Sequence, residues 1–246
     1  MELDRSASAL GLYKYKSDPP EGDLFGGFYS TILGQLELCG VTPTYVGAGG
    51  RGYSGKLTKF NGRTHKRMVK SEFSDVEMVA IAANPQGSDE PAYDSFASAS
   101  LSYADATHEL LPCIFINERL LRLRSAEYGA LLNSLADLCQ WDFGYGFSAS
   151  VEKQPEMFIL GLDNGKLSPE EYASLSTWYA TPGEVRTRLL RDVYPYNLLN
   201  DTQLDAQVSD GASLRQVAQR HPGTSLTRLT DHGLYLWTVP DAAIDP

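Results

Sequence analysis

Apolar spacing and helix-end residues together predict five helices along the chain. Apolar side chains recur at three- and four-residue steps over residues 24–39 and 125–139, which is the period of one buried helical face. Gly40 follows the first segment where a helix would end, and Ser125 precedes the second as a suitable N-cap. Capping residues predict two shorter helices, at residues 168–179 and 181–193. A further short helix over residues 213–219 is predicted to end at His221-Pro222-Gly223.

A period of two, or a short apolar run between turn residues, predicts strands. Residues 96–103 alternate apolar side chains with serine, and residues 141–149 alternate aromatic with small side chains. Residues 225–229 and 234–239 flank an Asp-His-Gly turn and are predicted to form a terminal hairpin. Three other short segments are β-prone, at 42–46, 76–83 (a strand or the end of a helix) and 113–116.

Helices and strands alternate without a regular βαβ order or a fixed-period repeat, which favours an α+β fold. We expect a mixed or antiparallel sheet with packed helices and a more helical C-terminal part. Proline and glycine punctuation predicts a flexible leader over residues 1–22. A seam at an Asp-Asn-Gly turn would separate an α+β region, 23–162, from a helical region with the terminal hairpin, 163–246. The two regions could equally form one continuous domain.

Charge is distributed unevenly along the 246 residues, whose net charge is −10. Residues 51–70 contain seven Lys or Arg and no carboxylate, whereas residues 71–118 contain nine carboxylates and no Lys or Arg. Asn61-Gly62 lies between two β-prone segments, so the basic stretch is predicted to lie on a hairpin. The acidic balance disfavours nucleic acid as a partner, since phosphates would be repelled over most of the surface, and favours a basic protein.

Two phosphate-binding patterns overlap in the glycine-rich segment that starts at Gly47. Residues 47–52 fit GxGxxG, and residues 50–56 fit the first part of a P-loop. A P-loop needs Ser or Thr after its lysine to hold Mg²⁺, and Leu57 stands there instead. An alternative function remains from this segment: an enzyme acting on a phosphorylated or anionic small molecule, with Gly49, Arg51 and Lys56 as the anion-binding residues.

Catalytic and metal-binding signatures are otherwise lacking in the sequence. The four histidines are scattered and none is spaced as a zinc ligand pair, so we expect no metal and no cofactor. No GxSxG nucleophile pattern occurs, and three separated cysteines favour reduced thiols. No signal peptide and no membrane-spanning apolar run are visible. The sequence therefore predicts a cytoplasmic binding protein rather than an enzyme.

The C-terminal residues 190–199, Ser213-Leu214 and 226–237 resemble small bacterial immunity proteins of type VI secretion and polymorphic toxin systems. The resemblance covers about 60 residues and implies a protein without catalysis that binds and neutralises one cognate secreted toxin. An adaptor or chaperone of a secretion system is a further alternative. Exposed carboxylates and aromatic residues would bind a basic toxin. Two groups of residues are the candidates for this contact: Asp89, Glu90, Tyr93 and Asp94, and then Asp142, Tyr145 and Asp163.

Overall fold

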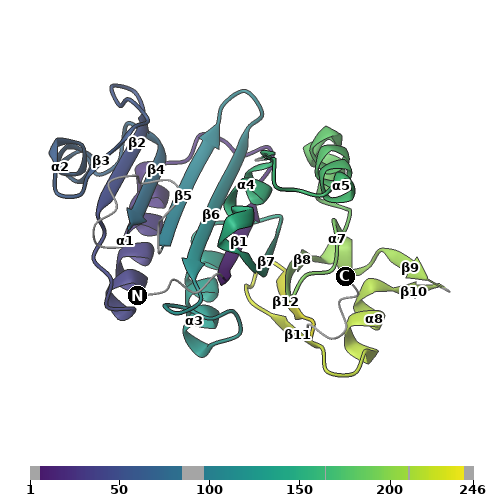
Figure 1. Ribbon diagram of the computed structural model, residues 1–246. Coiled ribbons are helices and arrows are strands. Elements are labelled where there is room, and N and C mark those ends of the chain that lie inside the picture. Colours follow the sequence, from purple (N-terminus) through teal and green to yellow (C-terminus); the bar gives the residue numbers. More distant parts are fainter. Residues whose placement is uncertain (1–5, 85–96, 164, 210, 241–246) are drawn as a thin grey trace.

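The computed structural model describes residues 6–84, 97–163, 165–209 and 211–240, and it is built around a ten-stranded sheet (Figure 1). The strand order in this sheet is β11-β12-β8-β7-β1-β6-β5-β4-β2-β3, and neighbouring strands are antiparallel. Strands β9 and β10 form a separate two-stranded sheet. The predicted α+β class and antiparallel pairing are confirmed.

The strands are β1 (Ser6–Tyr13), β2 (Tyr45–Gly50), β3 (Leu57–Lys59), β4 (Val76–Ala83), β5 (Ala97–Ala104), β6 (Glu109–Asn117), β7 (Phe143–Ser150), β8 (Tyr196–Asn200), β9 (Gln207–Ser209), β10 (Ala212–Ser213), β11 (Ser225–Arg228) and β12 (Leu234–Thr238). The helices are α1 (Gly22–Leu38), α2 (Arg63–Lys70), α3 (Ala126–Ala136), α4 (Pro155–Leu160), α5 (Pro169–Ala180), α6 (Gly183–Arg186), α7 (Asp201–Leu204) and α8 (Leu214–Arg220), with a 3-10 turn η1 (Val151–Lys153).

Side-chain caps begin three of the predicted helices, and those at Ser125 and Ser168 were expected. The Ser125 hydroxyl accepts a hydrogen bond from the amide of Tyr128 at the start of α3. Ser168 and Ser213 form complete capping boxes with Glu171 and Gln216 at the starts of α5 and α8. These side chains satisfy amides that would otherwise lack a partner in the first helical turn. The helix predicted over 181–193 is shorter than expected, because α6 spans four residues.

Residues 1–22, predicted as a flexible leader, instead contain a central strand of the sheet. Strand β1 pairs with β6 on one side and with β7 on the other, and all its residues after Ser6 are buried. Its small residues weaken the apolar alternation that would have predicted it. They also permit close packing: a Cβ atom added at Gly11 would lie 2.6 Å from Cγ2 of Ile159 in α4.

Helices cover the two faces of the sheet in separate layers. On one face, α1 and α3 bury side chains such as Phe25, Phe28 and Tyr128 against the alternate residues Leu10 and Leu12 of β1. On the opposite face, α4 and α5 bury side chains against the intervening residues of β1. Each fully buried Phe or Leu stabilises the fold by roughly 1.5–3 kcal/mol relative to an exposed one, so these two layers hold the sheet.

The basic stretch at residues 51–70 does not form the predicted hairpin. Strands β2 and β3 pair around a turn at residues 51–56, and helix α2 begins directly after Asn61-Gly62. Asn61 adopts a left-handed φ of 64°, which reverses the chain at the end of β3. Helix α2 buries Met68 alone among its residues. A single buried position leaves no apolar period, which is why the helix was not predicted.

The C-terminal region contributes strands as well as helices. β8, β11 and β12 extend the same ten-stranded sheet that β1 and β7 belong to, and β11 and β12 form the predicted terminal hairpin. Helices α7 and α8 cover them through a small cluster that includes Leu204, Leu214 and Trp237. The prediction of a more helical C-terminal part is therefore not confirmed.

Candidate functional site

The first group of predicted contact residues, Asp89, Glu90, Tyr93 and Asp94, lies outside the residues that the structure describes. Of the second group, Asp163 is exposed in the connection between α4 and α5. One of its carboxylate oxygens accepts a hydrogen bond from the amide of Gly165 at 2.7 Å. Asp163 therefore closes a turn and is also free to meet a partner.

The other two residues of that group, Asp142 and Tyr145, are engaged within the fold. Asp142 accepts a hydrogen bond from the amide of Tyr15 at 2.7 Å and lies 3.3 Å from the Lys14 ammonium nitrogen. The ring of Tyr145 is buried at 2% exposure. Because it is buried, Tyr145 cannot contact a partner directly, and it packs against the aromatic residues described next.

Tyr145 belongs to a buried network of phenols between the sheet and helices α4 and α5. Its hydroxyl lies 2.6 Å from that of Tyr13, which in turn donates to the Ile159 carbonyl at 2.8 Å. Tyr179 donates to the same carbonyl, and Arg191 donates to the Tyr145 hydroxyl. The network ties β1, β7, α4, α5 and the chain before β8 together.

Burial keeps these phenols protonated. Desolvation raises the pKa of Tyr13, Tyr145 and Tyr179 above the ordinary value of 10, which disfavours the phenolate at neutral pH. In this protonated form Tyr13 and Tyr179 donate hydrogen bonds to the Ile159 carbonyl, which holds α4 against β1.

A cleft of about 530 Å³ opens next to this network, between the end of β7, α4, α5 and the chain at residues 192–194. Its floor contains three aromatic rings, of Phe147, Phe158 and Tyr194. The Tyr194 ring stacks on Tyr145 with centroids 4.6 Å apart, and Phe147 meets Phe158 edge-on at 5.7 Å. Tyr145, a predicted contact residue, thus supports the floor from behind.

Arg191 fixes the floor from below. Its guanidinium carbon lies 3.9 Å from the ring centroid of Phe158 and 5.2 Å from that of Tyr145. Within the described part of the chain, no carboxylate forms an ion pair with it. Its charge is held by aromatic faces and one phenol, an arrangement that orients the rings of the cleft.

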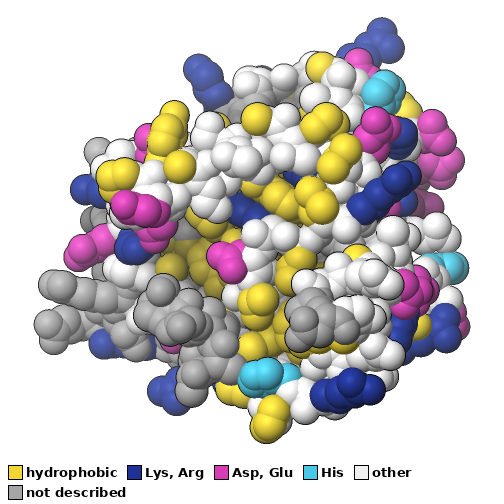
Figure 2. Space-filling model, turned by 90° about the vertical axis from the view of Figure 1, so that its right-hand side faces the viewer, with side chains coloured by type: hydrophobic (Ala, Val, Ile, Leu, Met, Phe, Trp, Pro, Cys, Tyr) yellow, Lys and Arg dark blue, Asp and Glu magenta, His cyan; other side chains and the backbone are white. Residues whose placement is uncertain are grey.

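The rim of the cleft carries more carboxylates than bases. Glu170, Glu171 and Asp192 line it together with a single lysine, Lys153. That lysine lies 2.9 Å from Glu171, whereas Glu170 and Asp192 are exposed and have no ion pair to any residue that the structure describes. Figure 2 shows hydrophobic side chains gathered in a hollow on the side where α5 lies, with acidic side chains on either side.

Sequence reasoning missed this cleft although it found its parts. The alternation of aromatic and glycine residues in 143–147 places Phe147 and Tyr145 on one face of β7. Glu170 lies in the first turn of the predicted helix over 168–179, and Tyr194 lies 47 residues beyond Phe147 in the sequence. The tertiary fold alone brings these elements together.

The predicted anion-binding residues Gly49, Arg51 and Lys56 belong to the β2–β3 hairpin. Gly49 lies in β2 and pairs with Met78 of β4, so the glycine-rich run forms a strand rather than a loop that wraps a phosphate. Arg51 and Lys56 are exposed in the turn that follows. In the described ranges, no group of three His, Cys, Asp or Glu side chains is placed to hold a metal ion, and no helix is both long and apolar enough to cross a membrane.

Comparisons with known proteins show a likeness to solved structures. No protein-family model matches the chain, and no curated protein matches it. The solved structure of the Pseudomonas aeruginosa T6SS protein PA0821 is similar with a TM-score of 0.61 and 14% sequence identity. The similarity covers 95% of this chain but 65% of the Pseudomonas chain. At this identity the likeness shows a shared fold across nearly the whole of the described sheet and its helices.

Proposed function

We propose that this protein is an immunity protein of a type VI secretion system, which binds a cognate secreted toxin and neutralises it. The observation that carries the proposal is the cleft with an aromatic floor and, at its rim, the exposed carboxylates of Glu170 and Asp192, which form no ion pair with a described residue. The fold shared with the Pseudomonas aeruginosa T6SS protein PA0821 supports a link to type VI secretion. The C-terminal resemblance to immunity proteins points to the same class.

The chemistry of the cleft suits a cationic side chain of a basic partner. An Arg or Lys entering it would meet the ring faces of the floor, each worth roughly 0.5–2 kcal/mol to a cation. The carboxylates of Glu170 and Asp192 would accept its hydrogen bonds. Pre-ordered rings reduce the entropy lost on binding, because Tyr194 is already stacked on Tyr145.

The surrounding surface would supply the rest of the contact. A stable interface buries about 800 Å² on each partner, which is more than the cleft alone provides. Tyr172 of α5 and Leu162 after α4 are half exposed, at 50% and 51%, and they add apolar area near the helices that line the cleft. The net charge of −10 would steer a basic toxin toward this protein and raise its association rate.

Co-expression tests the proposal directly. The toxin encoded beside this gene is expressed in a bacterial host with and without this protein, and colony counts and co-purification are measured. We expect survival only in the presence of this protein, together with a complex that persists through purification. Unchanged killing, or protection without any complex, would contradict neutralisation by binding.

A further inference from the structure

We propose that the basic surface of helix α2 binds a short acidic, extended segment of a protein, at a site separate from the cleft. This basic surface consists of four exposed side chains on α2, Arg63, Lys66, Arg67 and Lys70. The inference does not depend on the immunity role. Figure 1 places α2 beyond β3 at one end of the sheet, whereas α5 lies toward the other end.

The positive charge of this surface is not neutralised within the described structure. The ion pairs there use Lys14, Lys16, Lys153, Arg186 and Arg215, and none of them uses a base from residues 51–70. The carboxylate-rich segment of residues 71–118 directly follows the basic stretch of residues 51–70 in the sequence. In the described ranges the seven cations of the basic stretch face solvent or neutral groups, so they are available to an anionic partner.

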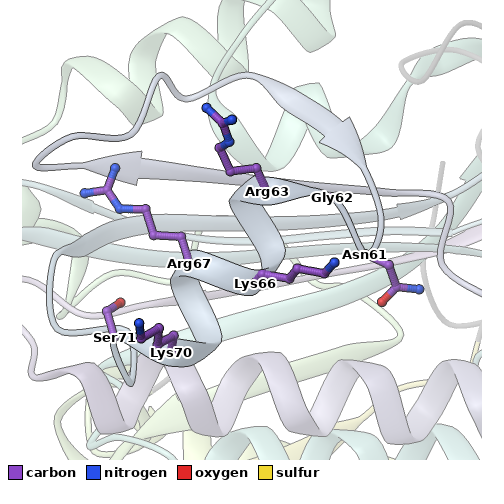
Figure 3. Close-up of a pocket in the computed structure, with 7 residues that line it drawn as sticks. All are labelled: Asn61, Gly62, Arg63, Lys66, Arg67, Lys70 and Ser71. Carbon is purple, nitrogen blue, oxygen red and sulfur yellow. The ribbon is translucent and has the colours of Figure 1, made fainter.

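Helix geometry arranges these cations in two rows. Arg63 and Arg67 are four residues apart, as are Lys66 and Lys70, so each pair lies about 5–6 Å apart on the helix surface. Figure 3 shows Arg63 and Arg67 projecting on one side of α2, with Lys66 directed toward Asn61 and Lys70 beside Ser71. Together these residues line an open concavity of about 670 Å³.

One of the four cations is held in place before any partner arrives. The Arg67 guanidinium stacks over the Tyr53 ring at 4.4 Å and donates a hydrogen bond to the Gly52 carbonyl at 2.5 Å. Ordering a long side chain in advance removes part of the entropy cost of binding. Its second terminal nitrogen donates to the Arg51 carbonyl at 3.4 Å, so Arg67 fixes the β2–β3 turn against α2 and holds a positive charge beside the other three cations.

The dimensions of the surface favour an extended peptide over other anions. Alternate residues of an extended strand project to one side roughly 6.6 Å apart, close to the spacing within each row. A small phosphate compound would be enclosed in a deep site, whereas this concavity is lined by exposed side chains. A long nucleic acid would run onto the remainder of the chain, which carries 31 carboxylates against 14 Lys and Arg.

The test uses the full-length protein and a labelled ten-residue peptide with glutamate at alternate positions. Binding is measured by fluorescence anisotropy at 50 mM NaCl. A variant combining Arg63→Glu, Lys66→Glu and Lys70→Glu removes the three cations of the surface whose side chains form no hydrogen bond or ion pair among the described residues. The matched control combines Arg119→Glu, Arg188→Glu and Arg220→Glu, three exposed bases elsewhere in the chain, and thermal unfolding verifies that both variants fold.

We expect the wild type and the control to bind the peptide within threefold of each other, and the α2 variant to bind at least tenfold more weakly. Absence of peptide binding by the wild type, or an equal loss in the control, would overturn the proposal. Duplex DNA of ten base pairs and pyrophosphate are measured in parallel. Tighter binding of either probe than of the peptide would assign the surface to nucleic acid or to a small phosphate compound instead.

Discussion

Arg191 provides the sharpest test of how the floor of the cleft is held. Its guanidinium gains one charge-assisted hydrogen bond to Tyr145, about 1.5–3 kcal/mol, and a close aromatic contact with Phe158, about 2 kcal/mol when desolvated. Against these gains stands the desolvation of a cation, several kcal/mol, with no carboxylate paired to it in the described structure. The favourable contacts and the desolvation cost of the charge nearly cancel, so the Arg191 side chain stabilises the fold mainly through the volume that it fills.

Two substitutions separate the charge from the volume. Arg191→Met keeps most of the volume and removes the charge, so its free energy of unfolding should stay within about 1 kcal/mol of the wild type. Arg191→Ala leaves a cavity beside Phe158, and the loss from Met to Ala at a buried site is about 2–5 kcal/mol.

Urea unfolding followed by tryptophan fluorescence measures both variants, because Trp141, Trp178 and Trp237 are all buried. With a slope of about 3 kcal/mol per M, a loss of 3 kcal/mol lowers the midpoint by about 1 M. A methionine variant as unstable as the alanine variant would refute the reasoning, since the charge itself would then be the stabilising element.

Three further predictions concern packing, capping and pH. Gly144→Ala places a Cβ atom 2.6 Å from the Gly11 carbonyl oxygen and should destabilise the fold by about 2 kcal/mol. The control is Gly34→Ala, whose Cβ atom would have no neighbour within 4 Å. Equal urea midpoints for the two variants would refute the close packing of β1 on β7. Ser168→Ala removes the cap of α5 and should lower stability by about 1 kcal/mol, visible as faster amide exchange in the first turn; unchanged exchange would count against the capping box. Burial raises the pKa of Glu156 above 4.5, so the protonated form is favoured in the fold and stability is lost as pH rises through the raised pKa. Glu156→Gln should therefore gain stability over the wild type at pH 7 but not at pH 4, and the same difference at both pH values would exclude this titration.

Local signals in the sequence were sufficient for elements whose ends or faces are marked by particular residues. Ser125 and Ser168 cap their helices as their positions predicted. The alternation of serine with apolar residues in β5 places the serines on one side of the sheet and side chains such as Leu101 in the core. Such signals depend on residues within one element, so they can be interpreted without knowledge of the tertiary fold.

Features that depend on distant contacts were not predictable in this way. Strand β1 is buried by its neighbours β6 and β7, not by the hydrophobicity of its own small residues. Helix α2 buries only Met68 among its residues, and its other contacts, such as His65 stacked on Phe60, join segments of different elements. The cleft joins Phe147, Phe158, Glu170 and Tyr194 from four separate segments, and no local pattern records that they meet.

Affinity for the cognate toxin, measured by calorimetry on three forms of this protein, tests the central claim most directly. The forms are the wild type, the rim variant Glu170→Lys with Asp192→Lys, and a control, Glu37→Lys with Asp137→Lys, which makes the same charge change at exposed positions of α1 and the end of α3 on the opposite face of the sheet. We predict a tight complex for the wild type and the control, and binding at least 100-fold weaker for the rim variant, a loss of about 2.7 kcal/mol. Equal affinity of all three forms would contradict the assignment of the cleft, and no binding by the wild type would contradict the proposed function itself.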